Sequence, residues 1–146
     1  MIKKYNLMII LIFTNIFMGN ALSEKNFFLD AKKNYDEKKY DESKFLFQRN
    51  IVFNPKDENS YLYLAKIYNL EKNEEGEEKN INTVLLLNPN NEEATYILME
   101  IELKKSNYSK VLELVENFTK ICVKLCDNKN LILDSLKNLE PKNESE

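Results

Sequence analysis

Two cysteines are the residues whose type and spacing most suggest chemistry. Cys122 and Cys126 are the only thiols among 146 residues, and three residues separate them. In an intact helix the Cβ atoms of residues i and i+4 lie about 5–6 Å apart, whereas a disulfide needs about 3.5–4.5 Å. We therefore predict two buried or half-buried free thiols. A structural disulfide is the alternative, and it requires the last helical turn to unwind near Asp127.

A thiol redox factor is a third interpretation of the pair, but redox-active cysteines are typically spaced C-x2-C rather than C-x3-C. Two thiolates without His or further Cys also make a poor zinc site. The chain contains no His, which excludes imidazole catalysis. No Ser or Thr has a suitably spaced Lys partner either, so no nucleophilic triad is visible.

Carboxylates are the remaining candidates for acid–base chemistry. The densest run also holds Lys72 and Lys79 and lies at a turn between helices, an arrangement typical of a solvated surface. Its members are Glu71, Glu74, Glu75, Glu77 and Glu78. We predict that the protein is not an enzyme and has no cofactor, no metal site and no small-molecule substrate.

Composition narrows the class of protein further. The formal net charge of -3 excludes a strongly basic nucleic-acid binder. With only 2 Gly and 3 Pro, the chain has no Gly-rich phosphate loop and does not suit a turn-rich all-β fold. Its length fits one modest domain.

Residues 1–21 have the pattern of a signal peptide. Lys3 and Lys4 precede the apolar run from Leu7 to Met18, and Gly19 and Ala21 supply small residues for cleavage. Such a run rises about 18 Å as a helix, short of the roughly 30 Å membrane core. We predict an exported, periplasmic protein. The alternative is an uncleaved N-terminal anchor in the inner membrane, which would be the protein's one membrane contact.

The elements that must position any site follow a 34-residue period. Pro55 and Pro89 lie that far apart, and each follows an Asn. At this period apolar residues share columns: Phe27 over Tyr61, Ala31 over Ala65, and Phe47 over Ile81 and Val115. Within one period, Tyr61, Leu64, Ala65 and Tyr68 have the i, i+3, i+4, i+7 spacing of a helix face.

This pattern resembles the tetratricopeptide-repeat (TPR) family. Large, small and aromatic residues at family positions carry the resemblance. They are Phe27, Ala31, Tyr40, Ser43, Phe47, Ile51 and Pro55, then Tyr61, Leu64, Ala65, Tyr68, Ile81, Val84, Leu85 and Pro89, then Leu98, Tyr108, Val111, Val115 and Phe118. Asn50 and Glu77 depart from it, since the family has small residues there. The resemblance implies an all-α, helix-hairpin solenoid with three repeats at 24–57, 58–91 and 92–125.

We expect helices at 24–38, 41–53, 58–71, 75–87, 92–105 and 108–126. Asp57 and Asn91 precede Glu58 and Glu92, which is the order of an N-cap and an acid at a helix start. After a break at 127–130, a helix in residues 129–139 is expected to cap the third repeat, running from Leu131 to Leu139. Residues 140–146 are expected to form a disordered, solvated tail.

The resemblance also implies a binding surface, because the first helix of each TPR hairpin lines the concave face where peptides dock. The matching positions are Phe28, Lys32, Tyr35, Leu62, Lys66, Asn69, Tyr96, Glu100 and Leu103. Cations beside an apolar stripe suit a segment that carries an acidic group. The alternative is that Phe28 and Tyr96 pack as core. The carboxylate clamp of chaperone-binding TPRs is absent, because its positions hold Phe28, Lys32, Tyr63, Glu93 and Ile97.

The sequence therefore predicts a protein–protein interaction scaffold that holds a peptide segment of a partner, within an envelope-assembly complex. The first alternative is a membrane-tethered structural subunit that self-assembles. The second is the thiol redox factor built on Cys122 and Cys126.

Overall fold

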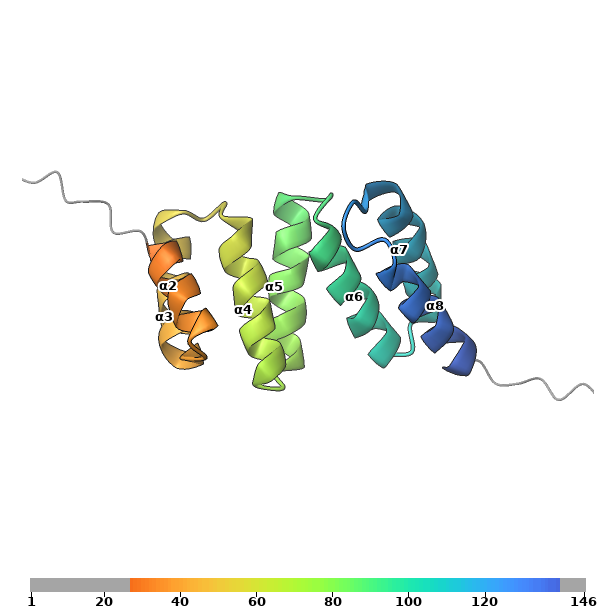
Figure 1. The fold of residues 1–146 in the computed structure, drawn as a ribbon, viewed down its shortest axis with the longest axis horizontal. Helices are drawn as coiled ribbons and strands as arrows, with labels where there is room; N and C mark the ends of the chain where they lie inside the picture. The colour runs from red at the N-terminus through yellow and green to blue at the C-terminus, as the bar shows by residue number, and fades with distance from the viewer. Residues whose placement is uncertain (1–26, 140–146) are drawn as a thin grey trace, which may run out of the picture.

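A computed structural model describes residues 27–139, and this part of the chain is all-α, as predicted (Figure 1). The helices pair as antiparallel hairpins, α2 with α3, α4 with α5 and α6 with α7, and α8 packs against α6 and α7. Their bounds are α2 Phe27–Asp36, α3 Tyr40–Phe53, α4 Glu58–Leu70, α5 Glu74–Leu87, α6 Glu92–Lys104, α7 Tyr108–Ile121 and α8 Asn128–Leu139.

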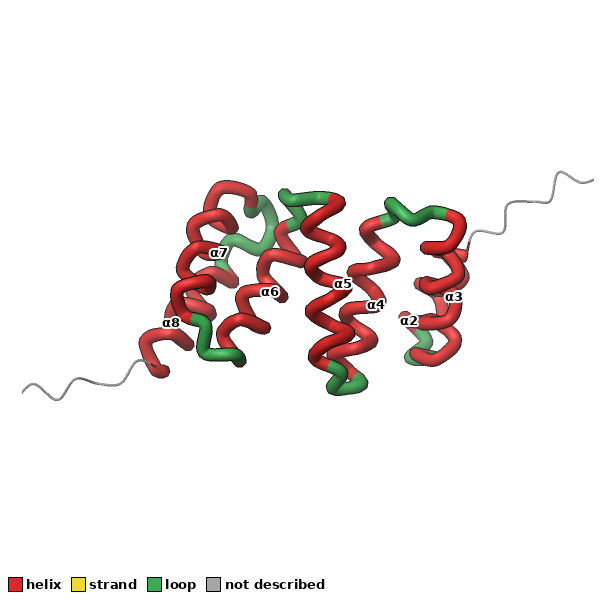
Figure 2. Tube along the Cα trace, turned by 180° about the vertical axis from the view of Figure 1, so that it is seen from behind, coloured by secondary structure: helices red, strands yellow, loops and turns green. Residues whose placement is uncertain are grey.

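The hairpins stack in chain order along the long axis of the molecule. Figure 1 shows the α2–α3 hairpin at one end and α8 at the other, and Figure 2 shows the same order from behind. Each hairpin packs against the next one along the chain. The fold is therefore a solenoid of three hairpins with an additional helix at its C-terminal end, as the sequence indicates.

The turn inside each hairpin repeats the same backbone geometry. Lys38, Lys72 and Ser106 have φ of 60°, 58° and 59°, in the left-handed region. The next N–H in each turn donates to a carbonyl five residues earlier: Lys39 to Asn34 at 2.8 Å, Asn73 to Tyr68 at 2.9 Å and Asn107 to Glu102 at 2.9 Å. These bonds close the helix C-terminus in the way a Schellman motif does. The 34-residue period is thus present in the backbone itself.

Helices α3 and α5 end just before the two Asn-Pro pairs, since Pro disfavours the α conformation of the preceding residue. Asn91 caps α6 as predicted, because its side chain accepts from the Ala94 N–H at 2.9 Å. Asp57 does not cap α4 in this way. Its carboxylate accepts instead from the Ser60 hydroxyl at 2.7 Å.

The apolar core is divided into two clusters that meet at α4. Leu64 and Ile67 belong to the first cluster, with Ala31 and Phe47 of the α2–α3 hairpin. Leu62 and Ala65 belong to the second, which runs through α5, α6 and α7 to α8. Ala31 and Ala65 are fully buried where helices approach closely, in agreement with the small residues of the repeat pattern.

Polar residues buried between the helices are all hydrogen-bonded within residues 27–139. Asn50, which stands at a position of small residues in the family, is 4% exposed. Its amide donates to the Asp57 carboxylate at 2.7 Å and to the Ser60 hydroxyl at 2.9 Å. This network joins the end of α3 to the start of α4 across the loop that contains Pro55.

The expected helix bounds are wrong at one place. The helix expected at 108–126 ends at Ile121, and α8 begins at Asn128, inside the expected break. Cys122 has extended backbone angles, with φ -66° and ψ 141°, so the helix cannot continue through it. Among the described residues no helix has the length and apolar character of a membrane span. The predicted signal peptide and the tail at 140–146 lie outside the described residues.

Candidate functional site

A groove runs along the first helices of the hairpins. Its volume is about 390 Å³, and its walls come from α2, α4, α5, α6, the α7–α8 loop and the first residue of α8. Of the nine predicted binding positions, five line this central groove: Tyr35, Lys66, Asn69, Tyr96 and Glu100. These positions, which the TPR resemblance implied, therefore lie on three helices that meet at one surface.

A second groove of about 570 Å³ lies between α6 and α8. Leu103, a sixth predicted position, lines it together with Leu131 and Leu139 of α8. Tyr96 and Glu100 line both grooves. The central groove and this end groove therefore adjoin at α6.

Two predicted positions that line neither the central groove nor the end groove act in packing. The Phe28 ring lies 5.7 Å from Phe47 and 6.0 Å from Tyr63, between ring centroids. Leu62 is buried in the second cluster. Tyr96 has both roles, because its ring lies 6.4 Å from the buried Phe118 while its other side lines the grooves.

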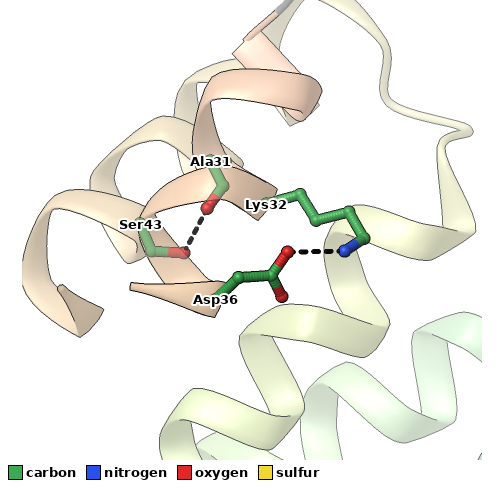
Figure 3. A network of polar contacts seen from close by, with 4 residues as sticks. All are labelled: Ala31, Lys32, Asp36 and Ser43. Atoms are coloured by element: carbon green, nitrogen blue, oxygen red, sulfur yellow. Dashed lines mark hydrogen bonds and ion pairs between the residues drawn. The ribbon is translucent and has the colours of Figure 1, made fainter. Parts of the chain in front are cut away.

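Both predicted cations are already paired with carboxylates. Figure 3 shows the Lys32 ammonium bonded to Asp36, 2.7 Å away and one turn along α2, next to the Ser43 hydroxyl that donates to the Ala31 carbonyl. The Asp36 hydrogen bond raises the pKa of Lys32. Lys66 lies 2.7 Å from Glu93 of α6. The stripe thus lacks the unpaired cations on which the expectation of an acidic segment depended.

Carboxylates dominate the charge of the central groove. Lys66 is the one cation among the residues that line it, against Glu77, Glu93 and Glu100. Glu77 is 5% exposed and accepts from the Asn69 amide at 2.8 Å. Burial first, and then a hydrogen bond with Glu100, raise the pKa of the Tyr96 hydroxyl. The lining therefore has a formal charge of -2, one Lys against three Glu.

Glu77 and Glu93 were not among the predicted site residues. Glu93 falls at the i, i+3, i+4 and i+7 spacing with Tyr96, Ile97 and Glu100, so the α6 face that lines the groove was readable from the sequence. Glu77 comes from the second helix of a hairpin. Only the side-by-side packing of α4 and α5 brings it to this surface.

The two cysteines are joined in a disulfide rather than free, which corrects the predicted free thiols. The prediction assumed an intact helix. Because α7 ends at Ile121, both cysteines lie in the α7–α8 loop, and their Cα atoms are 5.2 Å apart. Within residues 27–139 no group of three or more potential ligands is arranged to hold a metal ion.

The same loop is held by the Glu92 carboxylate at the start of α6. Its Oε2 accepts from the backbone N–H groups of Val123 at 2.7 Å, Lys124 at 3.0 Å and Leu125 at 3.3 Å. These bonds hold the pKa of Glu92 below its ordinary value. Leu125 lines the central groove. Glu92 and the disulfide therefore fix one wall of the groove.

No family model and no curated protein matches the sequence. Solved structures do match. The first TPR of Spaghetti (RPAP3) bound to an HSP90 peptide has a TM-score of 0.68 and 15% identity, covering 79% of this chain and 91% of that one. The TPR2B domain of yeast Sti1, in a pHsp70 complex, has a TM-score of 0.69 and 12% identity, covering 78% and 95%.

A third match is the type III secretion chaperone SycD of Yersinia enterocolitica, in complex with a peptide of the translocator YopD. Its TM-score is 0.67 at 13% identity, and the match covers 82% of this chain and 95% of that one. The helix hairpins, their stacking and these matches agree. Residues 27–139 have the fold of tetratricopeptide-repeat domains.

Proposed function

We propose that the protein is a binding module that holds a segment of a partner protein in the central groove, without making or breaking a bond. The observation that carries the proposal is this groove, because it runs over α2, α4 and α6 and is lined by charged, amide and aromatic side chains. The three matched structures support it, since they are complexes with an HSP90 peptide, with pHsp70 and with a YopD peptide.

We further propose that the protein is exported to the periplasm and serves in an envelope-assembly complex. The signal-peptide pattern of residues 1–21 supports export. The Cys122–Cys126 disulfide supports it independently, because structural disulfides persist in oxidising compartments such as the periplasm. The envelope role rests on the combination of that compartment with a binding fold.

Site-specific photo-cross-linking in the native cell tests the binding proposal. A photoreactive residue replaces Leu70, which is 53% exposed and lines the central groove. The matched control replaces Leu86, which is 82% exposed on α5 and lines neither groove. We expect a protein adduct from position 70 and none from position 86. Adducts from position 86 alone would contradict binding in the groove.

Mass spectrometry of the purified native protein tests the export proposal. We expect a chain that begins at Leu22, with Cys122 and Cys126 resistant to alkylation until a reductant is added. A chain that retains residues 1–21 would support the membrane-tethered subunit instead. Reduced cysteines in the freshly isolated protein would contradict residence in an oxidising compartment.

A further inference from the structure

We propose that the segment held in the central groove is basic: it presents a Lys or Arg side chain to Glu100 and Glu93, beside the rings of Tyr35 and Tyr96. The inference rests on the proposed function and names the chemistry of its partner. The charge of this segment is opposite to that of the acidic segment expected from the positions of Lys32 and Lys66 in the sequence.

The first argument is the imbalance of charge in the groove. The lining has three carboxylates and one ammonium, and that ammonium is already 2.7 Å from Glu93. Within residues 27–139 the ion pairs include none to Glu77 or Glu100. An acidic segment would meet like charge here unless Lys66 first left Glu93. A basic segment would supply the missing positive charge.

The second argument is the position of Glu100. It lies where the central groove and the end groove adjoin, so a chain that follows both must pass it. A cation bound there would therefore meet a carboxylate at the junction of the two grooves.

The third argument is the aromatic lining. Lys and Arg side chains have an apolar stem below a charged head, and aromatic rings bind both parts. The protein already uses such contacts, with the Lys66 ammonium 4.9 Å from the Tyr63 ring centroid and the Lys44 ammonium 5.2 Å from that of Tyr68. Tyr35 and Tyr96 offer the same kind of surface inside the groove.

The protein's own C-terminal residues do not fit this description. Residues 140–146 contain three Glu and one Lys, so their side chains have a net charge of -2. They would be repelled by a groove of the same sign. The C-terminal residues are therefore not the basic segment that we propose, and we assign that role to a segment of another protein.

Selection from a random library of short displayed peptides tests the inference with the mature full-length protein as bait. We expect wild type to enrich peptides that contain Lys or Arg. Glu100→Lys should weaken the selected peptides about tenfold, since it replaces an attraction by a repulsion. Glu116→Lys is the matched control, because it makes the same change of charge at an exposed position of α7 outside both grooves. It should leave binding unchanged.

Glu100→Gln removes the charge with little change of shape, and it replaces Glu100→Lys if that variant fails to give a helical circular dichroism spectrum. Suppose instead that wild type enriches acidic or uncharged peptides and that these peptides no longer bind the Leu70→Trp variant, in which a larger side chain obstructs the groove. That result would overturn this inference and leave groove binding intact. Selected peptides that are insensitive to changes at both Glu100 and Leu70 would overturn this inference and the proposed function together.

Discussion

Replacing Glu92 with Ala should lower the free energy of unfolding by about 2–3 kcal/mol. The Glu92 carboxylate accepts from three backbone N–H groups of the α7–α8 loop. Hydrogen bonds to a charged group contribute about 1.5–3 kcal/mol each, but Glu92 is half-exposed, and in the variant the freed N–H groups can bind water. We therefore expect about 2 kcal/mol for the set. The negative charge at the start of α6 adds about 0.3–1 kcal/mol.

Urea unfolding followed by circular dichroism measures this change, which corresponds to roughly 10 °C in melting temperature. Glu74→Ala is the matched control, because Glu74 is an exposed acid at the first position of α5 and no hydrogen bond of its side chain is seen in the described structure. The control should lose only the helix-end contribution. If Glu92→Ala and Glu74→Ala destabilised the protein equally, the loop contacts would contribute nothing and the reasoning would be refuted.

The contribution of Glu92 should also depend on pH. Its folded-state pKa lies below the ordinary value of 4.5, because backbone N–H groups of Val123 and Lys124 favour the charged form. The stabilisation is therefore fully present above about pH 4.5 and is lost as the pH falls through the folded pKa. Glu92→Gln cannot ionise. The difference in stability between wild type and this variant should shrink as the pH falls below 4.

Three further substitutions test the fold, each by urea unfolding. Gly76→Ala should destabilise by about 1–3 kcal/mol despite the better helix propensity of Ala, because its Cβ would lie 2.8 Å from the Tyr68 ring; unchanged stability would mean that the ring moves freely. Lys72→Gly should stabilise by about 0.5–1 kcal/mol, since φ there is 58°; a loss would contradict the turn geometry. Asn50→Ala should cost about 1–3 kcal/mol by leaving Asp57 and Ser60 short of a donor, and a neutral result would count against the network.

The sequence predicted the helices well because the 34-residue period constrains them from several directions at once. Pro55 and Pro89 indicate where α3 and α5 end, and Ala31 and Ala65 indicate where neighbouring helices approach each other closely. The region after Phe118 lacks such a marker, since Val123 stands where the third Pro would be. The helix end there depends on the disulfide and on Glu92. The nearest residue in sequence whose N–H donates to the Glu92 carboxylate is Val123, 31 residues away. A local pattern cannot show a contact of that range.

The candidate site was predicted only in outline. The resemblance to TPR repeats indicated the face that carries Tyr35, Lys66 and Tyr96, because the first helix of each hairpin lines the concave surface in that family. It did not give the charge of the groove. Lys32 and Asp36 lie one helical turn apart, so their ion pair could be predicted from their spacing in the sequence. The ion pair between Lys66 and Glu93 could not, because it depends on how closely α4 and α6 pack.

The division of the core at α4 has a consequence for how the molecule opens. Because the α2–α3 hairpin packs mainly against α4, it can unfold while the larger cluster from α5 to α8 stays intact. Amide protons of α2 and α3 should accordingly exchange with deuterium before those of α5 and α6. Tyr35 is on this less protected hairpin and is also a wall of the groove. A partner that contacts Tyr35 would therefore bind the form in which α2 and α3 are folded, and it would slow amide exchange across these two helices. Binding in the groove and the cooperative folding of the solenoid are thus thermodynamically linked.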